Sequence, residues 1–117
     1  MKKNNFVNEL FSLDGKTVVL TGAAGRLGSR FAHILCASGA NVILVDKDTK
    51  KNTKLKLELS KKYDTTCEVF DINITNESAV KQMVKKIIKK FKKIDVLINN
   101  AHFVPRDHPK RDFPFEK

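Results

Sequence analysis

Four short apolar runs alternate with segments of helical period along this chain, and that alternation restricts the fold more than any other feature of the sequence. Each run is continuous and rich in β-branched residues, which is typical of strands buried on both faces. The predicted strands cover 17–21, 41–46, 67–72 and 95–101. Strands separated by helices in this order predict an α/β fold, with a parallel sheet joined by right-handed crossovers.

Three helices are predicted between these strands, each with one apolar stripe. The first covers 26–38, the second starts at Asp48 or Thr49, and the third starts at Thr75 or Asn76, since these side chains can cap a helix. The residues expected to face inward are Leu27, Phe31, Ile34 and Leu35 in the first helix, Leu55 and Leu59 in the second, and Val80, Met83, Val84, Ile87, Ile88 and Phe91 in the third.

The length of 117 residues suits one domain. We expect an N-terminal arm over 1–15 with room for a short packing helix, the sheet domain over 16–102, and a proline-containing loop or tail over 103–117. The sequence lacks the run of roughly 18 apolar residues that a transmembrane helix needs. It also lacks the apolar stretch of a secretory signal after its first lysines, so we expect a cytoplasmic protein without membrane contact.

The formal net charge of +10 favours binding of phosphate groups. Only four of the 23 basic residues are arginines, the residue type that most often makes bidentate contacts with bases and phosphates. Most of the lysines fall on the predicted second and third helices, where solvated faces explain them. Binding to nucleic acid or an anionic surface therefore stays a remote alternative, and it predicts affinity that falls steeply with salt.

The two cysteines, Cys36 and Cys67, both lie in apolar segments. Their spacing does not match a metal site, and no metal is expected. We therefore interpret them as two buried thiols in a reducing compartment.

A glycine-rich segment, TGAAGRLG, follows the first predicted strand and opens the first predicted helix. Gly22 would allow the tight turn, Gly25 would let the backbone approach a pyrophosphate, and Gly28 would let the helix pack closely on the strand. The free N–H groups and the dipole at the helix start favour an anion there. The alternative is a glycine turn that only connects strand to helix.

Asp46 ends the second predicted strand, 18 residues after Gly28. A carboxylate at this place can accept hydrogen bonds from the hydroxyls of an adenosine ribose, and it repels a 2′-phosphate. This favours NAD over NADP, although Arg26 and Lys47 lie close enough in sequence to soften the preference. The alternative is a surface aspartate that caps the following helix.

The segment LINNA at the end of the fourth predicted strand completes a series of motifs, each at a strand end. With TGAAGRLG, Asp46 and the pair Asp71–Ile72, it makes residues 14–102 resemble the short-chain dehydrogenase/reductase family. The resemblance implies a Rossmann-like doubly wound parallel sheet, incomplete, with about four strands and three helices. A nucleotide-binding methyltransferase is a remoter alternative, and LINNA counts against it.

The resemblance also implies roles for single residues. Gly22, Gly25 and Gly28, with Arg26 and Leu27, would form the pyrophosphate loop, and Asp46 would hold the adenosine ribose. The other implied contacts are Asp71 with the adenine amino group, the Ile72 backbone beside it, and Asn99 and Ala101 along the cofactor and the central strand. A capping role for Asp71 and a purely structural role for Asn99 are the alternatives.

The sequence departs from the family pattern at three places. Gly25 stands one position earlier than in the commoner glycine motif, and His102 stands where a glycine often follows NNA. The only tyrosine, Tyr63, precedes the third predicted strand and has Cys67 four places later, so the family's Tyr-x-x-x-Lys pair has no counterpart. No catalytic residue is therefore assigned.

The functional expectation that follows is the NAD-binding part of an oxidoreductase that moves a hydride between a nicotinamide cofactor and an alcohol or carbonyl substrate. This part is expected to be truncated and inactive alone, and to bind a small-molecule substrate only in a full-length form. An oligomer fits the family as well. The alternative is a nonenzymatic dinucleotide-binding or regulatory module.

Overall fold

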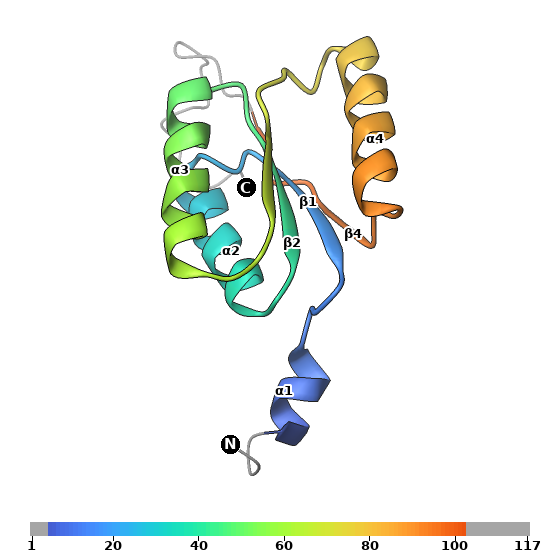
Figure 1. Cartoon of the computed structure of the whole chain (residues 1–117). Helices are drawn as coiled ribbons and strands as arrows, with labels where there is room; N and C mark the ends of the chain where they lie inside the picture. The colour runs from blue at the N-terminus through green and yellow to red at the C-terminus, as the bar shows by residue number, and fades with distance from the viewer. Residues whose placement is uncertain (1–4, 103–117) are drawn as a thin grey trace, which may run out of the picture.

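The computed structural model describes residues 5–102, which form one parallel sheet with helices on both faces (Figure 1). The strands are β1 (Thr17–Thr21), β2 (Asn41–Val45), β3 (Cys67–Phe70) and β4 (Val96–Ile98). The helices are α1 (Asn5–Phe11), α2 (Arg26–Ala37), α3 (Thr49–Lys62) and α4 (Glu77–Phe91). The expected tail over 103–117 lies outside the described residues.

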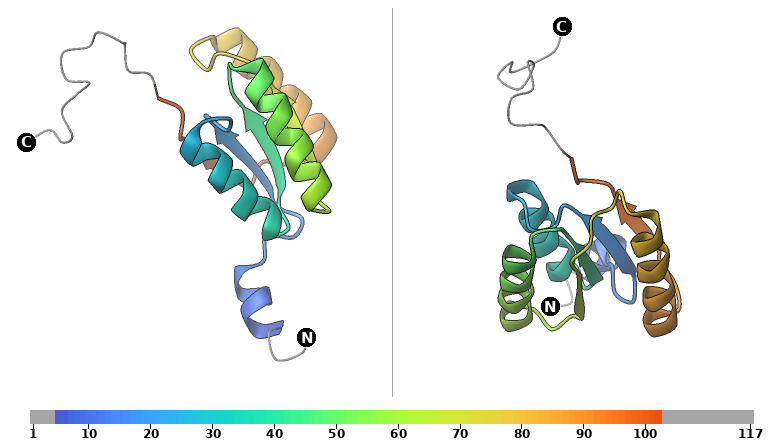
Figure 2. Two further views of the ribbon diagram at one scale, coloured as in Figure 1. Left: turned by 90° about the vertical axis from the view of Figure 1, so that its left-hand side faces the viewer. Right: turned by 90° about the horizontal axis from the view of Figure 1, so that it is seen from above.

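The sheet has the strand order β3-β2-β1-β4, and every neighbouring pair is parallel. Helices α2 and α3 pack on one face of it and α4 packs on the other (Figures 1 and 2). This confirms the doubly wound, Rossmann-like sheet of four strands. The chain reverses its direction of winding between β1 and β4, which is the point where such folds open a crevice for ligands.

The two core clusters use opposite faces of the same strands. Val18, Leu20, Val42 and Leu44 face α2 and α3, whereas the alternate residues of β1 and β2 face α4. All five residues of β1 are buried, as expected for a central strand that is covered on both faces. β4 is a sheet edge in the described part of the chain, and 56% of Leu97 is exposed there.

The structure corrects the expected helix count, because Asn5–Phe11 forms a fourth helix that extends away from the sheet (Figure 1). The short helix therefore exists, but it does not pack: Phe6, Val7, Leu10 and Phe11 are all exposed. Among the described residues, no helix is both long enough and apolar enough to cross a membrane.

The expected inward stripe of α2 is partly wrong. Leu27 and Ile34 are exposed, and the buried residues of this helix are Gly28, Ala32, Leu35 and Cys36. Small residues at the contact let α2 approach β1 more closely than a leucine-rich stripe would allow.

The other two helices agree better with the sequence. Leu55 and Leu59 of α3 are buried as expected. In α4, Met83 and Ile87 are buried, while 41% of Ile88 is exposed because the outer side of the predicted stripe has no cover in the described chain.

The caps of α3 and α4 decide between the alternatives that the sequence left open. The Asp48 carboxylate accepts the Lys51 N–H at 3.1 Å, so Asp48 rather than Thr49 caps α3. The Asn76 side chain accepts the Ala79 N–H at 3.1 Å, so Asn76 rather than Thr75 caps α4. Both caps satisfy an N–H that has no partner inside its helix.

Candidate dinucleotide site

A cavity of about 620 Å³ opens at the carboxyl ends of the strands. Its walls come from the segments that follow each of the four strands, as the reversal between β1 and β4 leads one to expect. The sequence-predicted residues that line it are Gly22, Gly25, Arg26, Leu27, Asp46, Ile72 and Ala101. Gly28, Asp71 and Asn99 do not line it.

Gly22 and Gly28 are needed for the shape of the loop. Gly22 has a φ of +65°, and a Cβ there would come within 2.9 Å of the Ala101 Cα atom. A Cβ on Gly28 would come within 2.1 Å of the Gly22 carbonyl oxygen. These two glycines therefore hold α2 against the loop and the loop against the chain after β4.

Gly25 has a different reason to be a glycine. A Cβ on it would make only an ordinary contact, 3.4 Å from the Gly22 oxygen, so the protein itself leaves room for a side chain. Gly25 is the N-cap of α2 and lines the cavity, and no side chain caps the helix. The first N–H groups of α2 are therefore available to an anion.

Asp46 binds the glycine loop directly. Its Oδ2 atom accepts the Ala24 N–H at 2.9 Å, and its Oδ1 atom accepts the Asp48 N–H at 2.9 Å. The capping alternative for Asp46 is therefore wrong, because Asp48 caps α3. Each carboxylate oxygen keeps a second acceptor position, which a ribose hydroxyl at the cavity could use.

Thr21 and Asn100 connect the ends of β1 and β4. The Thr21 hydroxyl oxygen accepts the N–H groups of Asn100 and Ala101, at 3.0 and 3.1 Å. The Asn100 side chain donates to the Gly22 carbonyl oxygen at 3.2 Å. Sequence reasoning missed both residues. Thr21 begins the quoted glycine segment and Asn100 is the second asparagine of LINNA, so the signal was present in the motifs.

The structure gives the sheet-bridging amide contact to Asn100 rather than to Asn99. Asn99 is exposed, whereas Asn100 is half-buried and reaches the loop. Neighbouring residues in an extended chain point to opposite sides, so only one of two adjacent asparagines can face the loop.

Asp71 lies just outside the cavity, beside Ile72, which lines it. Its Oδ1 atom accepts a hydrogen bond of 3.2 Å from the Asn52 side chain, which also donates to the Leu44 carbonyl oxygen at 3.0 Å. Asn52 is fully buried, and its own Oδ1 atom has no partner in the described structure. Asn52 therefore positions the Asp71 carboxylate beside the cavity, and no motif in the sequence points to this role.

Cationic side chains line the same cavity. Arg26, Arg30 and Lys47 contribute to its walls, and so does His102. Three cations beside one carboxylate favour a ligand that carries several negative charges, such as a pyrophosphate. Among residues 5–102, no group of three or more potential ligands could hold a metal ion.

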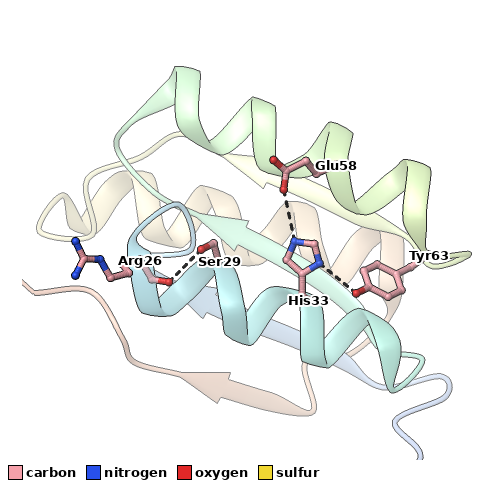
Figure 3. Close-up of polar contacts among 5 residues, drawn as sticks. All are labelled: Arg26, Ser29, His33, Glu58 and Tyr63. Atoms are coloured by element: carbon pink, nitrogen blue, oxygen red, sulfur yellow. Dashed lines mark hydrogen bonds and ion pairs between the residues drawn. The ribbon is translucent and has the colours of Figure 1, made fainter.

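The single tyrosine lies away from the cavity, on the side of the molecule formed by α2 and the end of α3 (Figure 3). Its hydroxyl is 3.1 Å from Nδ1 of His33, whose Nε2 atom is 3.5 Å from the Glu58 carboxylate. Tyr63 thus joins a polar contact between the two helices. It does not take part in the cavity, in agreement with the sequence, which offers it no Lys partner.

Comparisons with known proteins agree with this geometry. Residues 16–117 match the family model described as short chain dehydrogenase. A relative from Gibberella zeae, described as a short chain dehydrogenase/reductase, is 38% identical over 104 residues, which are 89% of this chain but 38% of the relative. The chain thus spans well under two thirds of the length of that relative.

Solved structures show the same likeness. An NAD⁺-bound xylitol dehydrogenase superposes with a TM-score of 0.74 at 30% identity, over 78% of this chain and 35% of the other. A metagenomic short-chain oxidoreductase in complex with NADP gives a TM-score of 0.72 at 26% identity, over 77% of this chain and 40% of the other. Similar folds therefore bind either dinucleotide.

Proposed function

The chain belongs to the short-chain dehydrogenase family, and we propose on that premise that its cavity binds NAD as the nucleotide-binding part of an oxidoreductase. The observation that carries this proposal is the convergence of the glycine loop, the start of α2 and Asp46 on one cavity. A helix start without a side-chain cap suits a pyrophosphate, and a carboxylate beside it suits ribose hydroxyls. The proposed reaction is hydride transfer to or from an alcohol or carbonyl substrate.

Each part of the dinucleotide has a proposed partner in this chain. The pyrophosphate would lie on the loop and the start of α2, the adenosine ribose on Asp46, and the adenine near Asp71 and Ile72. The nicotinamide half would run toward the segment after β4. The proposed contacts are Gly22, Gly25, Arg26, Leu27 and Gly28 for the pyrophosphate loop, and Asn99 and Ala101 for the far half.

NAD is preferred over NADP in this proposal because Asp46 lines the cavity at the end of β2. A 2′-phosphate would meet the Asp46 carboxylate, which is held in place by the Ala24 and Asp48 N–H groups. Arg26 and Lys47 also line the cavity and would attract such a phosphate. The preference for NAD is therefore expected to be moderate.

The chemistry divides between the cofactor and the protein. Bound NAD would supply the hydride acceptor, and NADH the hydride donor. This chain would bind and orient the cofactor. The reaction also needs a proton donor or acceptor at the substrate oxygen, and the one tyrosine is engaged with His33 away from the cavity. We therefore propose that this chain alone binds NAD without turnover.

That last point favours a second candidate function, a nonenzymatic dinucleotide-binding module. Both candidates predict that this chain binds NAD without turnover, and they differ in whether the chain forms part of a longer, active oxidoreductase. Oxidation of a panel of alcohols and sugars with NAD at ordinary enzymatic rates would contradict the nonenzymatic candidate, and it would also contradict our expectation that this chain is inactive alone.

The binding test is calorimetric titration of the 117-residue chain with NAD and with NADP. We expect saturable binding of both and tighter binding of NAD. The matched variants are Gly25→Ala, which places a methyl group at the pyrophosphate position, and Ser60→Ala, an exposed change on α3. Loss of NAD affinity in the first but not the second supports the proposal. Absence of binding by the folded wild-type chain at millimolar NAD would refute it.

A further inference from the structure

Two cysteine side chains meet inside the core, away from the cavity. Cys36 of α2 and Cys67, the first residue of β3, have their Sγ atoms 3.5 Å apart. Both thiols are free, with 2% and 5% of the residues exposed. Neither residue lines the cavity or contributes to the dinucleotide contacts described above. The pair has no part in the proposed function, so a separate explanation is needed.

The two thiols are not chemically equivalent. The contact with the Cys67 thiol, opposed by burial and helped by Thr65, lowers the pKa of Cys36 to about 7. The same contact with Cys36, together with burial, raises the pKa of Cys67 well above its ordinary value. Thiolates are the nucleophilic form of cysteine. Each thiol lies where it could resolve a sulfenic acid formed on the other, and we take Cys36, with the lower pKa, as the attacking thiol.

We propose that Cys36 and Cys67 form a redox-active dithiol, which hydrogen peroxide oxidises to an intramolecular disulfide that joins α2 to β3. The carrying observation is the placement of two free thiols in contact within one core cluster. A disulfide bond is about 2.05 Å long, so the two sulfur atoms must approach each other by roughly 1.5 Å. Two cysteine side chains can share a movement of that size by adjusting their χ1 angles.

The reaction has two balanced steps. In the first, the Cys36 thiolate attacks one oxygen of the peroxide, a sulfur–oxygen bond forms, the O–O bond breaks, and hydroxide leaves. In the second, Cys67 gives its proton to that hydroxide and attacks the Cys36 sulfenic acid. The S–S bond then forms, the S–O bond breaks, and the hydroxide that leaves takes a proton from solvent to become the second water. Two thiols and one peroxide thus give one disulfide and two waters, and the two sulfurs lose two electrons to the peroxide.

The burial of the pair fits this choice of oxidant. A small uncharged peroxide can reach a thiol that is nearly covered, whereas a protein disulfide cannot approach it. The disulfide would close a loop of 31 residues between α2 and β3. Such a link stabilises a fold by restricting the unfolded chain. Peroxide is therefore expected to make this domain more resistant to heat.

The test treats the full chain with hydrogen peroxide, unfolds it, and alkylates the remaining thiols with N-ethylmaleimide. We expect a monomer that has lost two hydrogens, takes no alkyl group, and yields a tryptic fragment linking Cys36 to Cys67. Its melting temperature should rise by about 5 °C or more and return after dithiothreitol. Two alkylated thiols after peroxide, or only intermolecular disulfides, would overturn the proposal.

Two variants assign the roles of the thiols. Cys67→Ser should leave a Cys36 sulfenic acid that dimedone traps, whereas Cys36→Ser should give much less of this adduct. Equal trapping in both variants would contradict the assigned order of attack. If either variant fails to fold, the mapping of the linked fragment in the wild-type chain still decides the proposal. None of these measurements needs a bound cofactor, so the result is independent of the proposed function.

Discussion

The Asp46 carboxylate accepts a hydrogen bond from the Ala24 backbone N–H, with 2.9 Å between Oδ2 and the nitrogen. This contact joins the end of β2 to the glycine loop after β1. Asp46 therefore holds in place the loop that would bind the pyrophosphate. The same residue is proposed to bind the hydroxyls of the adenosine ribose.

Replacement of Asp46 should lower NAD affinity and change the cofactor preference. In Asp46→Asn, an amide replaces a charged acceptor, and hydrogen bonds to charged groups contribute about 1.5–3 kcal/mol. We expect NAD affinity to fall about tenfold or more and NADP affinity to fall less, because the repulsive charge is gone. The control is Asp48→Asn, which changes the α3 cap only. An unchanged ratio of NAD to NADP affinity in Asp46→Asn would contradict the proposed ribose contact.

Gly28→Ala should destabilise the fold although alanine is the better helix former. The new Cβ would lie 2.1 Å from the Gly22 carbonyl oxygen, and this oxygen belongs to the backbone, so it cannot move aside as the end of a flexible side chain could. Overpacking of this kind costs about 1–3 kcal/mol, more than the gain of about 1 kcal/mol in helix propensity. Urea unfolding measures the difference. Gly25→Ala is the matched control, with its Cβ at an ordinary 3.4 Å contact. Equal stability of the two variants would be inconsistent with the close packing of α2 on the loop.

Asn100→Ala should destabilise the fold more than Asn99→Ala. The first change removes the bond to the Gly22 oxygen, which contributes about 1 kcal/mol, whereas the second truncates an exposed side chain. Chemical unfolding of the two variants measures this difference directly. Greater destabilisation by Asn99→Ala would show that the roles of the two asparagines are reversed.

Asn52→Ala should affect both stability and recognition of the adenine base. It removes one hydrogen bond to the Leu44 carbonyl oxygen, which contributes about 1 kcal/mol, and it frees the Asp71 carboxylate to move. We expect a smaller preference for NAD over its hypoxanthine analogue, which lacks the adenine amino group. Thr53→Ala, an exposed change on the same helix, is the control and should leave both the stability and the preference unchanged. An unchanged preference in folded Asn52→Ala would show that Asp71 needs no positioning.

The stabilising contribution of Asp95 to the free energy of unfolding should be lost in acid. The Thr17 N–H donates to the Asp95 carboxylate at 2.8 Å, and this bond, aided by Lys93, holds the pKa of Asp95 below its ordinary value of 3.8. A group whose pKa is lower in the folded state stabilises the fold at pH values above its ordinary pKa. This contribution disappears as the pH falls through the lower, folded-state pKa. Asp95→Asn should therefore be less stable than wild type at pH 7 and closer to it at pH 3.

Urea unfolding at the two pH values tests this expectation. Asp64→Asn, an exposed change between α3 and β3, is the control and should leave the difference between the two pH values as in wild type. If the difference in the free energy of unfolding between Asp95→Asn and wild type were as large at pH 3 as at pH 7, the ionised carboxylate could not be the cause of that difference.

The strands could be predicted from sequence because buried parallel strands leave a strong local pattern. β1 and β2 are covered on both faces of the sheet, so continuous apolar runs identify them. The inward face of α2 could not be predicted in the same way. Its spacing fits both the leucine-rich stripe and the small residues around Gly28, and only the close approach to β1 decides between them.

The sequence predicted many of the residues that line the cavity, but it did not predict the hydrogen bonds between them and distant residues. The roles proposed for the glycines and Asp46 follow from their local positions, and most of these residues line the cavity. The bonds of Thr21 to Asn100 and of Asn52 to Asp71 join residues 79 and 19 positions apart. Such pairs depend on how the strands come together, and Asn99 and Asn100 are chemically identical until the path of the chain after β4 is known.

The contact of Thr21 with Asn100 and Ala101 also affects when the site can form. The glycine loop follows β1 near the beginning of the chain and Asp46 holds it from the end of β2, but its contacts with the chain after β4 come from residues 100 and 101. During synthesis, these contacts with residues 100 and 101 cannot form until the ribosome has released almost the whole described domain. Contacts between residues so distant in sequence form slowly and late in folding. Dinucleotide binding would then report the completed assembly of the sheet, and the cofactor would stabilise only chains that have reached that stage.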